Sequence, residues 1–344
     1  MMRALVLEKP GRPPVLAVKE TSIPSPGPGE VLVEVEACGF CHHDLLVMAG
    51  VLRRGVKPGV ILGHEISGTV VQPGEGVTTI ATGDRVVSLL TNACGRCERC
   101  RSGREHRCIY GEGIGHGRDG GFAEYVALSE FSLVKLPEDV DLTGAALLAC
   151  PMGVALQAVQ NVAEVRPGET TVVIGAGGGL GVHGLQMAAA LGSRVLAVTT
   201  SEDKLGRFAS LGAEEILHTD ELDFSEMVLA LTEDEGAEVV FDTVGSVLFS
   251  SSWRSLAQFG RLVLLGEVAG KAVELNLAEI IFRDARILGS SGVSRAVIEQ
   301  VVDMVSQGQV VPVVGGAMPL EEAATAFDLL TGRSIFGRLV LTGR

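Results

Sequence analysis

Aromatic side chains are scarce in this sequence. Its 344 residues include one tryptophan, two tyrosines and eleven phenylalanines. Proteins that bind single-stranded nucleic acid stack bases on aromatic rings, so this scarcity disfavours that class. Positive charge is also in deficit, because 28 lysines and arginines oppose 42 aspartates and glutamates, which gives a formal net charge of −14. A phosphate backbone has to be neutralised by clustered cations. We therefore predict no nucleic-acid partner.

Long apolar runs are missing as well. The uncharged stretch 142–163 contains Pro151, Gly153 and three amide side chains, which make it a poor bilayer span and a better buried helix. The apolar run at the N-terminus is too short for a secretory leader and is charged at once. We therefore expect no membrane association and a cytoplasmic location.

The length of the chain and its pattern of apolar residues predict two domains. A chain of 344 residues is longer than a single hydrophobic core usually accommodates. Residues 31–37 alternate apolar and polar side chains, as a half-buried strand does, and further short strands are expected at 66–71 and 84–89. After about residue 150, the continuous apolar run 172–174 and further expected strands at 194–198, 238–242 and 261–266 are separated by helical segments. This alternation is typical of a parallel sheet built from βαβ units. The last strand, 336–341, is expected to return to the first domain.

Four cysteines lie within one short loop. Cys94, Cys97, Cys100 and Cys108 have the spacing C-x2-C-x2-C-x7-C, which lets four thiolates converge on one tetrahedral Zn²⁺. Two local disulfides are the alternative. An odd total of seven cysteines and the absence of a recognisable leader favour a reducing compartment and a metal. Because four sulfur ligands leave no position for substrate, we expect this zinc to be structural.

A glycine-rich turn follows the first buried strand of the second domain. The segment 175–181 reads Gly-Ala-Gly-Gly-Gly-Leu-Gly and precedes a helical pattern. Residues without side chains let backbone N–H groups and a helix N-terminus approach a pyrophosphate. A merely tight turn does not explain five glycines in seven positions. We predict dinucleotide binding by Gly175, Ala176, Gly178, Gly179, Leu180 and Gly181.

The end of the next strand bears on the choice of dinucleotide. An NAD site normally places an acidic residue there, about 20 residues after the glycines, and here Thr199 stands in that place. Thr200, Ser201 and Lys204 follow, and together with Thr199 they could accept a 2′-phosphate. Glu202 or Asp203 could instead serve NAD from a shifted register. The missing acid favours NADP(H) over NAD(H).

Three cysteines remain outside the loop, namely Cys38, Cys41 and Cys150. Each alone reads as a small buried apolar residue, and His64 alone as an ordinary turn histidine. Beside a cofactor-binding fold, however, two thiolates and one imidazole are a known ligand set for a zinc ion with an open fourth position.

The sequence resembles the zinc-containing medium-chain alcohol dehydrogenases from its first strand to its last. The matching motifs are Cys41-His-His-Asp44, Gly63-His-Glu65, the four-cysteine loop, the segment 119–125 and the glycine turn. Zinc-free relatives such as quinone reductases lack these cysteines. The resemblance implies an α/β protein with a GroES-like β-barrel catalytic domain over 1–149 and 288–344, and a Rossmann domain with a doubly wound parallel sheet over 150–287.

The resemblance also assigns roles to individual residues. It makes Cys41, His64 and Cys150 the ligands of a catalytic zinc, and leaves Cys38 spare. It makes Asp44 the partner that orients a ligand, with Glu65 behind the metal. Further implied roles are contacts to the cofactor phosphates by His42 and Arg338, and a substrate-pocket wall at Leu90.

Three positions depart from the family pattern. His43 stands where a serine or threonine often begins the proton relay, so an imidazole either carries that proton or blocks the route. Val154 replaces a frequent threonine, and Ala176 replaces the first glycine of the usual fingerprint. These departures put a simple short-chain alcohol in doubt as substrate.

The expected function is reversible interconversion of an alcohol and its aldehyde or ketone, with hydride transfer to or from NAD(P). Two zinc ions per chain, one catalytic and one structural, and a homo-oligomer, a tetramer or a dimer, are implied by the resemblance. One alternative is NADPH-dependent reduction of an activated C=C bond, as in enoyl or quinone reductases. Another is a non-catalytic protein that kept the fold as a binding module.

Overall fold

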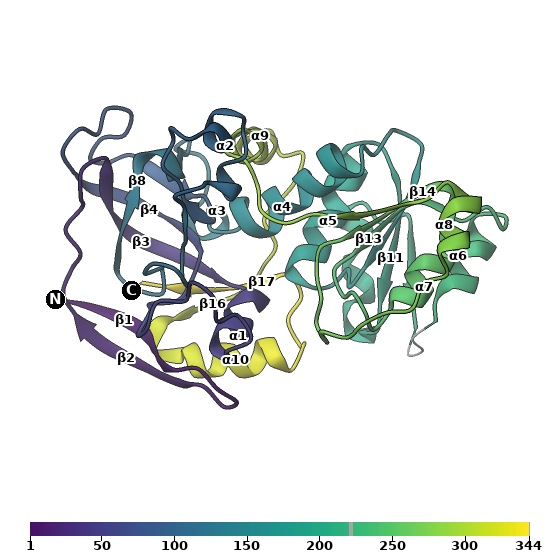
Figure 1. Ribbon diagram of the computed structural model, residues 1–344, viewed down its shortest axis with the longest axis horizontal. Coiled ribbons are helices and arrows are strands. Elements are labelled where there is room, and N and C mark those ends of the chain that lie inside the picture. The colour runs from purple at the N-terminus through teal and green to yellow at the C-terminus, as the bar shows by residue number, and fades with distance from the viewer. Residues whose placement is uncertain (220–222, 344) are drawn as a thin grey trace. The chain divides into compact units, whose positions relative to one another are not determined.

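The computed structural model describes residues 1–219 and 223–343, which form two compact units. The first unit contains Met1–Gly153 and Gly292–Arg344, and the second contains Val154–Ser291. Each division lies four residues beyond the predicted boundary at 149 or 287. Figure 1 shows that the N- and C-terminal segments of the chain share the first unit.

A seven-stranded sheet forms the centre of the first unit. Its strand order is β16 (Val314–Pro319), β17 (Arg338–Thr342), β3 (Glu30–Phe40), β4 (Glu65–Pro73), β5 (Arg85–Ser88) and β9 (Leu133–Lys135), with β8 (Tyr125–Ser129) paired to β3. Two-stranded sheets are formed by β1 (Met2–Lys9) with β2 (Val15–Thr21) and by β6 (Thr91–Asn92) with β7 (Glu112–Gly113). The last strand returns as predicted, because Leu339 lies opposite Phe40 in an antiparallel pair.

Side-chain alternation explains the core of this unit. In β3, Val31, Val33 and Val35 are buried, while Glu36 is exposed. The rings of Phe40 and Phe122 meet edge to face, with centroids 5.3 Å apart. The β4 and β5 strands confirm the expectations for 66–71 and 84–89.

Helices of the first unit are short, apart from two near the C-terminus. They are α1 (His42–Met48), α2 (Glu98–Arg101), α3 (Leu142–Ala145), α9 (Arg295–Ser306) and α10 (Ala323–Thr331). The 3₁₀ and π segments of both units are η1 (Glu105–Arg107), η2 (Glu130–Ser132), η3 (Leu148–Gly153), η4 (Gln157–Val162), η5 (Glu202–Arg207), η6 (Ala209–Leu211) and η7 (Leu320–Glu322).

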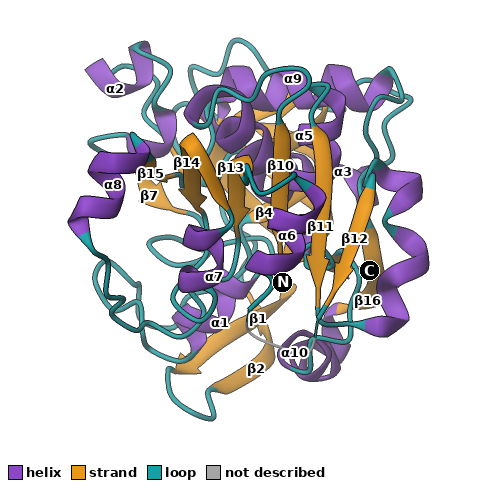
Figure 2. Ribbon diagram, turned by 90° about the vertical axis from the view of Figure 1, so that its right-hand side faces the viewer, coloured by secondary structure: helices purple, strands orange, loops and turns teal. Residues whose placement is uncertain are grey.

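A parallel six-stranded sheet forms the second unit, which confirms the predicted Rossmann-type fold. Its order is β12 (Glu215–His218), β11 (Arg194–Thr199), β10 (Thr170–Ile174), β13 (Ala237–Asp242), β14 (Leu256–Leu264) and β15 (Arg286–Gly289). The helices are α4 (Val154–Leu156), α5 (Gly179–Ala190), α6 (Ser225–Leu231), α7 (Phe249–Arg254) and α8 (Leu277–Arg283). Figure 2 shows these strands side by side with helices packed around them. All five residues of β10 are buried, as a central parallel strand requires.

The stretch 142–163 is mostly buried, but it does not form one helix. It is divided into α3, η3, α4 and η4, with Pro151 inside the π-helical η3. Proline lacks the N–H that a regular helix uses at that position, which accounts for the interruption. None of the described helices combines the length and the apolar composition that crossing a bilayer requires.

Candidate active site

The four loop cysteines converge on one point. Their sulfur atoms all lie within 4.8 Å of one another. The Sγ of Cys97 is 3.5 Å from that of Cys100 and 3.8 Å from that of Cys108. Four sulfurs bound tetrahedrally to one zinc would be about 3.8 Å apart, so the donor set and the spacing fit a closed zinc site. The four ligands of the predicted structural site thus come from one short segment of the chain. We call this segment, residues 94–108, the zinc lobe.

Backbone amides favour the thiolate form of one cysteine in the zinc lobe, Cys97, whereas burial raises the pKa of Cys100 to about 12. Cys97 is the N-cap residue of α2, which places Cys100 one turn further on. Hydrogen bonds from the backbone of Ile109 and Cys100 lower the pKa of Cys97 to about 6. A ligand that is already a thiolate near neutral pH loses little free energy to proton competition when zinc binds.

A second cluster brings together residues that are far apart in the chain. Cys41, His64, Glu65 and Cys150 offer ligand atoms within 4.8 Å of one another. The two sulfurs, on Cys41 and Cys150, are 4.0 Å apart. Cys41 ends the loop after β3, His64 precedes β4, and Cys150 belongs to η3. Two sulfurs and one imidazole match the ligand set of a catalytic zinc with one open position.

Asp44 fixes the orientation of His64. The carboxylate is fully buried, and its Oδ1 lies 3.2 Å from Nδ1 of His64. Its Oδ2 accepts a hydrogen bond of 2.8 Å from the backbone N–H of Cys41, at the start of α1. Since Nδ1 is engaged, Nε2 is the atom left for a metal, as in other carboxylate–histidine–zinc arrangements.

Proton equilibria in this cluster follow from its buried charges. Burial disfavours a positive His64, but Asp44 and the Cys41 thiolate outweigh burial and raise its pKa well above the ordinary value. The hydrogen bond from Cys150 lowers the pKa of Cys41, and the same bond raises the pKa of Cys150. Metal binding needs a neutral imidazole and two thiolates, so it must displace protons from His64 and Cys150.

Glu65 and Arg338 form a buried ion pair behind the cluster. The Nε of Arg338 lies 3.2 Å from Oε2 of Glu65. Burial raises the pKa of Glu65 to about 7, although Arg338 opposes this shift. Neither carboxylate oxygen of Glu65 has a hydrogen-bond partner, so both can respond to a cation in the cluster. Only glycine fits at position 39, because a Cβ there would lie 1.9 Å from Oε2 of Glu65.

Two further histidines lie beside the metal ligands. The ring of His43 is 5.1 Å from that of His64, and its Nε2 is 3.4 Å from Nδ1 of His116. Burial and the neighbouring His64 lower the pKa of His43 to about 4. The sequence analysis missed His116, which is 73 residues from His43 and has no motif around it. His116 covers Gly113, where a Cβ would meet its ring at 1.8 Å.

Other predicted residues of this unit lie at or near the cluster. Cys38 is buried outside the ligand set, next to the turn at Gly63. His42 is exposed at the start of α1, and Arg338 is 6 % exposed, with its guanidinium beside Glu65. Leu90 precedes β6, and its carbonyl accepts a hydrogen bond from Ile114. The nucleotide contacts of His42 and Arg338 and the pocket role of Leu90 stay predictions.

The glycine turn in the second unit has the geometry of a phosphate cradle. It joins β10 to α5, with Gly178 as the N-cap residue and exposed. Gly175 has a φ of +71°, which side chains disfavour. A Cβ on Gly181 would lie 2.1 Å from the carbonyl oxygen of Gly175. The exposed Gly178 and the N-terminus of α5 therefore provide a position at which a pyrophosphate could bind.

The residues predicted to distinguish the two cofactors cluster beyond β11. Thr199 ends this strand, and its Oγ1 accepts a hydrogen bond of 3.1 Å from the Ser201 backbone. Lys204 is only 6 % exposed, and its Cδ would lie 2.8 Å from a Cβ on Gly177. Thr200, Glu202 and Asp203 are exposed. A cation thus lies beside the glycine turn, while the preference for NADP(H) stays a prediction.

Comparisons with known proteins place these sites in a family. Residues 27–138 match the alcohol dehydrogenase GroES-like domain, and residues 179–307 match the zinc-binding dehydrogenase domain. The acryloyl-coenzyme A reductase of Metallosphaera sedula is 36% identical over 342 residues, which cover 99% of this chain and 100% of that protein. An alcohol dehydrogenase of Geobacillus stearothermophilus is 33% identical, with 99% of each chain covered.

A solved structure supports the same assignment. The crystal structure of an NAD-dependent alcohol dehydrogenase is 37% identical to this chain, with a TM-score of 0.94 and 99% of each chain covered. The chain therefore belongs to the zinc-binding medium-chain dehydrogenase/reductase family, and it is an oxidoreductase of the alcohol dehydrogenase type.

Proposed function

We propose that the protein is a zinc- and NAD(P)-dependent oxidoreductase that interconverts an alcohol and its aldehyde or ketone. The observation that carries this proposal is the convergence of Cys41, His64 and Cys150 in front of the buried Asp44. A zinc ion held by these three residues would supply a Lewis acid that polarises the substrate oxygen. Bound NAD(P) would supply or accept the hydride.

The chain's own residues prepare that chemistry. Asp44 holds His64 through Nδ1 at 3.2 Å and keeps the ring oriented. Glu65 lies beside the ligands, and its Oε2, 3.2 Å from Nε of Arg338, balances the charge of that guanidinium. Burial and the neighbouring His64 lower the pKa of His43 to about 4, so the ring is neutral at pH 7 and has one unprotonated nitrogen that can accept the substrate proton. Nε2 of His43 lies 3.4 Å from Nδ1 of His116, which holds the ring in position.

The cofactor is held by the second unit in this proposal. The N-terminus of α5, which begins beside the exposed Gly178, binds the pyrophosphate. Thr199, Thr200, Ser201 and Lys204 accept the 2′-phosphate of NADP(H). Support comes from the buried Lys204 beside Gly177 and from the lack of an acidic residue at the end of β11.

A second candidate is reduction of a C=C bond conjugated to the carbonyl of a coenzyme A thioester. The observation that favours it is the 36% identity, over nearly the whole chain, to a protein described as acryloyl-coenzyme A reductase. Polarising the thioester oxygen withdraws electrons from the β-carbon. Hydride from NAD(P)H adds there, a proton adds to the α-carbon, and oxidised cofactor leaves. The replacement of the usual hydroxyl by His43 fits this reaction as well.

One panel of substrates separates the two candidates. Zinc-loaded protein is mixed with NADPH or NADH and with aldehydes, ketones or enoyl thioesters, and in the reverse direction with primary and secondary alcohols and oxidised cofactor. The absorbance at 340 nm reports turnover. Turnover of carbonyls and alcohols supports the first candidate, and turnover of enoyl thioesters alone supports the second. No turnover of any class contradicts both, and more efficient use of NADH contradicts the NADP(H) preference.

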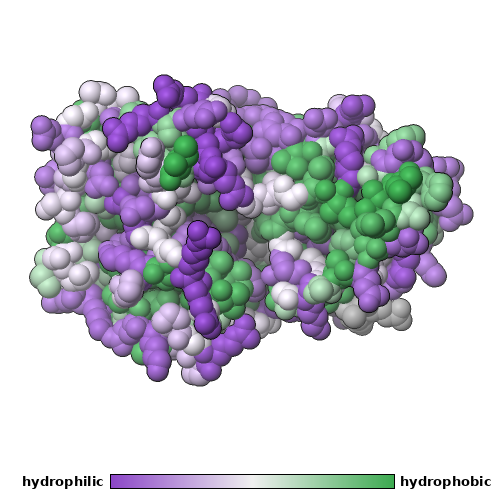
Figure 3. Space-filling model, viewed as in Figure 1, coloured by the Kyte–Doolittle hydropathy of each residue, from purple (hydrophilic) through white to green (hydrophobic). Residues whose placement is uncertain are grey.

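We also propose that the protein is a cytoplasmic homo-oligomer, a dimer or tetramer. Leu277, Ile281 and Phe282 of α8 are 69%, 68% and 79% exposed. Apolar side chains gather on the face of the second unit that carries this helix (Figure 3). Contiguous exposed apolar surface is typical of a protein–protein interface. Light scattering after size exclusion measures the mass, and a monomer at micromolar concentration would contradict the proposal.

A further inference from the structure

The zinc lobe concentrates arginine in a chain that is otherwise acidic. Arg96, Arg99, Arg101, Arg104 and Arg107 fall within twelve residues, in a protein with a net charge of −14. All five are exposed. Figure 3 shows strongly hydrophilic side chains gathered over α2, which lies in this lobe. Five arginines and two glutamates give this segment a net positive charge, whereas the chain as a whole is negative.

Most of these guanidinium groups lack a carboxylate partner. Within the described residues, no ion pair involves Arg96, Arg99, Arg101 or Arg104. Arg99 donates to the backbone carbonyl of Arg107 at 2.9 Å, and Arg104 donates to the hydroxyl of Ser102 at 3.1 Å. These contacts satisfy one donor each and leave the remaining N–H groups to solvent. Guanidinium forks of this kind bind phosphate oxygens in pairs.

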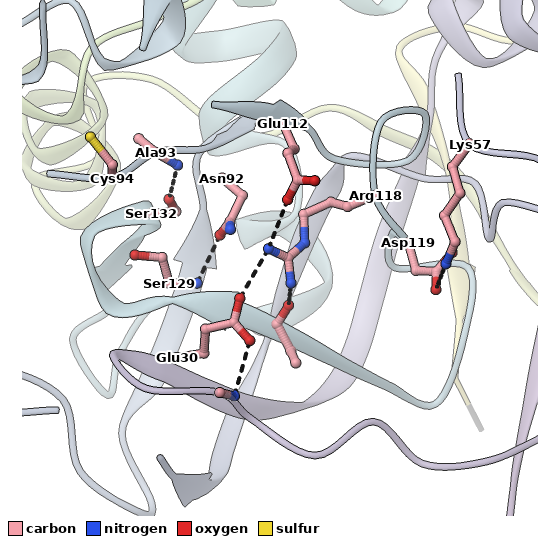
Figure 4. Close-up of polar contacts among 12 residues, drawn as sticks. Glu30, Lys57, Asn92, Ala93, Cys94, Glu112, Arg118, Asp119, Ser129 and Ser132 are labelled. Carbon is pink, nitrogen blue, oxygen red and sulfur yellow. Dashed lines mark hydrogen bonds and ion pairs between the residues drawn. The ribbon is translucent and has the colours of Figure 1, made fainter. Parts of the chain in front are cut away.

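By contrast, two cations outside the zinc lobe, Arg118 and Lys57, form ion pairs with carboxylates. Arg118 contacts Glu30 at 3.0 Å and Glu112 at 3.5 Å, and Lys57 contacts Asp119 at 2.6 Å (Figure 4). What distinguishes Arg96, Arg99, Arg101 and Arg104 is their concentration in one short exposed segment, since Arg53 also forms no ion pair within the described residues. A concentration of guanidinium groups of this kind is a surface that can bind an anion.

Exposed apolar and aromatic side chains accompany the arginines. Tyr110 is 70% exposed, Ile109 55% and Phe131 46%. The Phe131 ring lies against Gly95 of the lobe, where a Cβ would come within 2.4 Å. In a chain poor in aromatics, two exposed rings beside unpaired arginines offer stacking for a nucleobase. The lobe therefore offers guanidinium groups for phosphate and aromatic rings for adenine.

The base of the lobe is anchored next to the candidate active site. Asn92 accepts a hydrogen bond from the Ser129 backbone at 2.8 Å, and the Ala93 backbone donates to Ser132 at 2.7 Å (Figure 4). The strands that flank the lobe, β6 and β7, pair Thr91 with Gly113. His116, which contacts His43, covers that same Gly113.

The number of intervening residues limits how far the lobe lies from Leu90 and from Gly113, which His116 covers. Arg96 is six residues from Leu90, so their Cα atoms are at most about 21 Å apart even if the segment is fully extended. Tyr110 is three residues from Gly113, which limits that separation to about 11 Å. A ligand with a long flexible arm between its phosphates and its reactive group can span this interval.

We propose that the exposed arginines of the zinc lobe bind the phosphates of a coenzyme A thioester whose acyl end reaches the Cys41–His64–Cys150 site. Tyr110 and Phe131 stack the adenine, and the structural zinc holds the arginines on a rigid loop. This inference rests on the second proposed function. It adds the part of the substrate that is recognised and the residues that recognise it.

The decisive experiment compares two thioesters of the same enoyl acid. One carries coenzyme A, and the other carries pantetheine, which lacks the adenine and the nucleotide phosphates. Zinc-loaded full-length protein and the R99Q/R101Q/R104Q variant are assayed with both, and R286Q, which alters an exposed arginine of β15, is the control. Because the triple variant loses charged contacts to phosphate, its KM for the coenzyme A ester should rise roughly tenfold or more. Its kcat and its KM for the pantetheine ester should stay unchanged, as should all values for R286Q.

A different outcome would assign the arginines to the metal. They could serve to balance the negative charge of four thiolates around one zinc. In that case the triple variant would lose zinc and thermal stability, and both thioesters would be affected equally. That result, or equal KM values for the two esters in the unmodified protein, overturns the inference. The single variant R101Q repeats the test if the triple variant fails to fold, because Arg101 is exposed and forms no ion pair within the described residues.

A binding measurement keeps this inference separate from the proposed function. Coenzyme A itself is titrated into the protein and into the triple variant by calorimetry. Binding that the variant loses supports the inference even if no enoyl thioester is reduced, and that pattern would count against the second function alone. No binding of coenzyme A to the unmodified protein overturns the inference. Reduction of the pantetheine ester would then leave the function standing.

Discussion

The two cysteine-containing clusters of this protein are built in opposite ways. The zinc lobe takes its four sulfurs from one stretch of fifteen residues, Cys94 to Cys108, and it extends into solvent among arginines. The other cluster collects Cys41, His64 and Cys150 from three distant segments and buries two carboxylates beside them. A closed site of four identical ligands needs only a loop. An open site with oriented ligands needs a sheet, a helix start and a π-helical turn to place each atom.

Protons compete with zinc in both clusters, but they are held by different groups. In the lobe, backbone hydrogen bonds hold the pKa of Cys97 at about 6, whereas burial raises the pKa of Cys100 to about 12 and also raises that of Cys108. In the buried cluster, a neighbouring carboxylate and thiolate hold a proton on His64. Zinc therefore displaces protons from thiols alone in the lobe, and from an imidazole as well in the buried cluster.

The largest expected effect comes from removing a ligand of the buried cluster. His64→Ala should lower kcat/KM by about 10³-fold or more, since polarising the substrate oxygen is worth several kcal/mol. Zinc content should fall from two ions per chain to one, and cofactor binding should be retained. Elemental analysis and cofactor fluorescence measure these quantities. Unchanged turnover by a variant that holds one zinc would show that the buried cluster does not carry catalysis.

The glycine turn is a third site built from consecutive residues, and it offers a matched pair of variants. Gly181→Ala places a Cβ 2.1 Å from the Gly175 carbonyl, whereas a Cβ on Gly206 has nothing within 4 Å. Gly181→Ala should weaken NAD(P)H binding about 100-fold, because the turn and the start of α5 must move apart. Gly206→Ala should have no measurable effect. A fluorescence titration checks both, and equal effects would show that the turn does not hold the cofactor.

Removing a cysteine of the zinc lobe should lower stability and leave catalysis intact, whereas His64→Ala should lower catalysis. Cys100→Ser leaves the lobe without a complete zinc site and should lower the free energy of unfolding by roughly 3–5 kcal/mol, as loss of a structural metal does. The catalytic zinc and the kcat per folded molecule for small carbonyl substrates should persist. Calorimetry and active-site titration measure the two effects. Loss of kcat with unchanged stability would mean that the roles of the two clusters are exchanged.

Asp44→Asn should have the smallest effect of these substitutions. It tests whether Asp44 sets the pH dependence of zinc binding in the buried cluster. The amide keeps a hydrogen bond to His64 but removes the negative charge, so zinc affinity at pH 8 should fall about 10- to 100-fold. The sign of the pH effect follows from the raised pKa of His64. In the unmodified protein, proton release from His64 makes zinc affinity rise with pH until that folded-state pKa is passed, and release from Cys150 adds a further rise. In the variant, the part of the rise that comes from His64 should end at lower pH, because the charge that held its proton is gone.

Competition titrations of the metal-free protein between pH 6 and 8 measure this shift. Asp119→Asn is the control, since Asp119 pairs with Lys57 on the surface and is outside the cluster. An identical pH dependence in Asp44→Asn and the unmodified protein would show that Asp44 does not set the protonation of His64.

Sites built from consecutive residues could be predicted from the sequence alone. The C-x2-C-x2-C-x7-C spacing and the glycine turn after an apolar strand each contain the geometry within the motif. The choice of Cys41 over Cys38 needed the family resemblance, because both cysteines lie near the end of β3 and spacing does not separate them. Folding does so by turning Cys38 under Gly63 and Cys41 toward Cys150.

Long-range contacts could not be predicted. His116 meets His43 across 73 residues, and no local pattern marks the pair. The position of Arg338 beside Glu65 follows from the pairing of β17 with β3, which brings the two ends of the first unit together. The interruption of 142–163 by η3 depends on Pro151 and on the need to present Cys150 to the cluster. Such features depend on tertiary packing rather than on sequence periodicity.

The most direct test of the central claim is to return zinc to protein from which the Cys41–His64–Cys150 site has been emptied by mild chelation. The rate of hydride transfer at 340 nm and the amount of bound zinc are followed in the same titration, with the zinc lobe still loaded. The account predicts that activity rises in proportion to zinc bound at this site and levels off at one added ion per chain. Full activity before any zinc returns would contradict it.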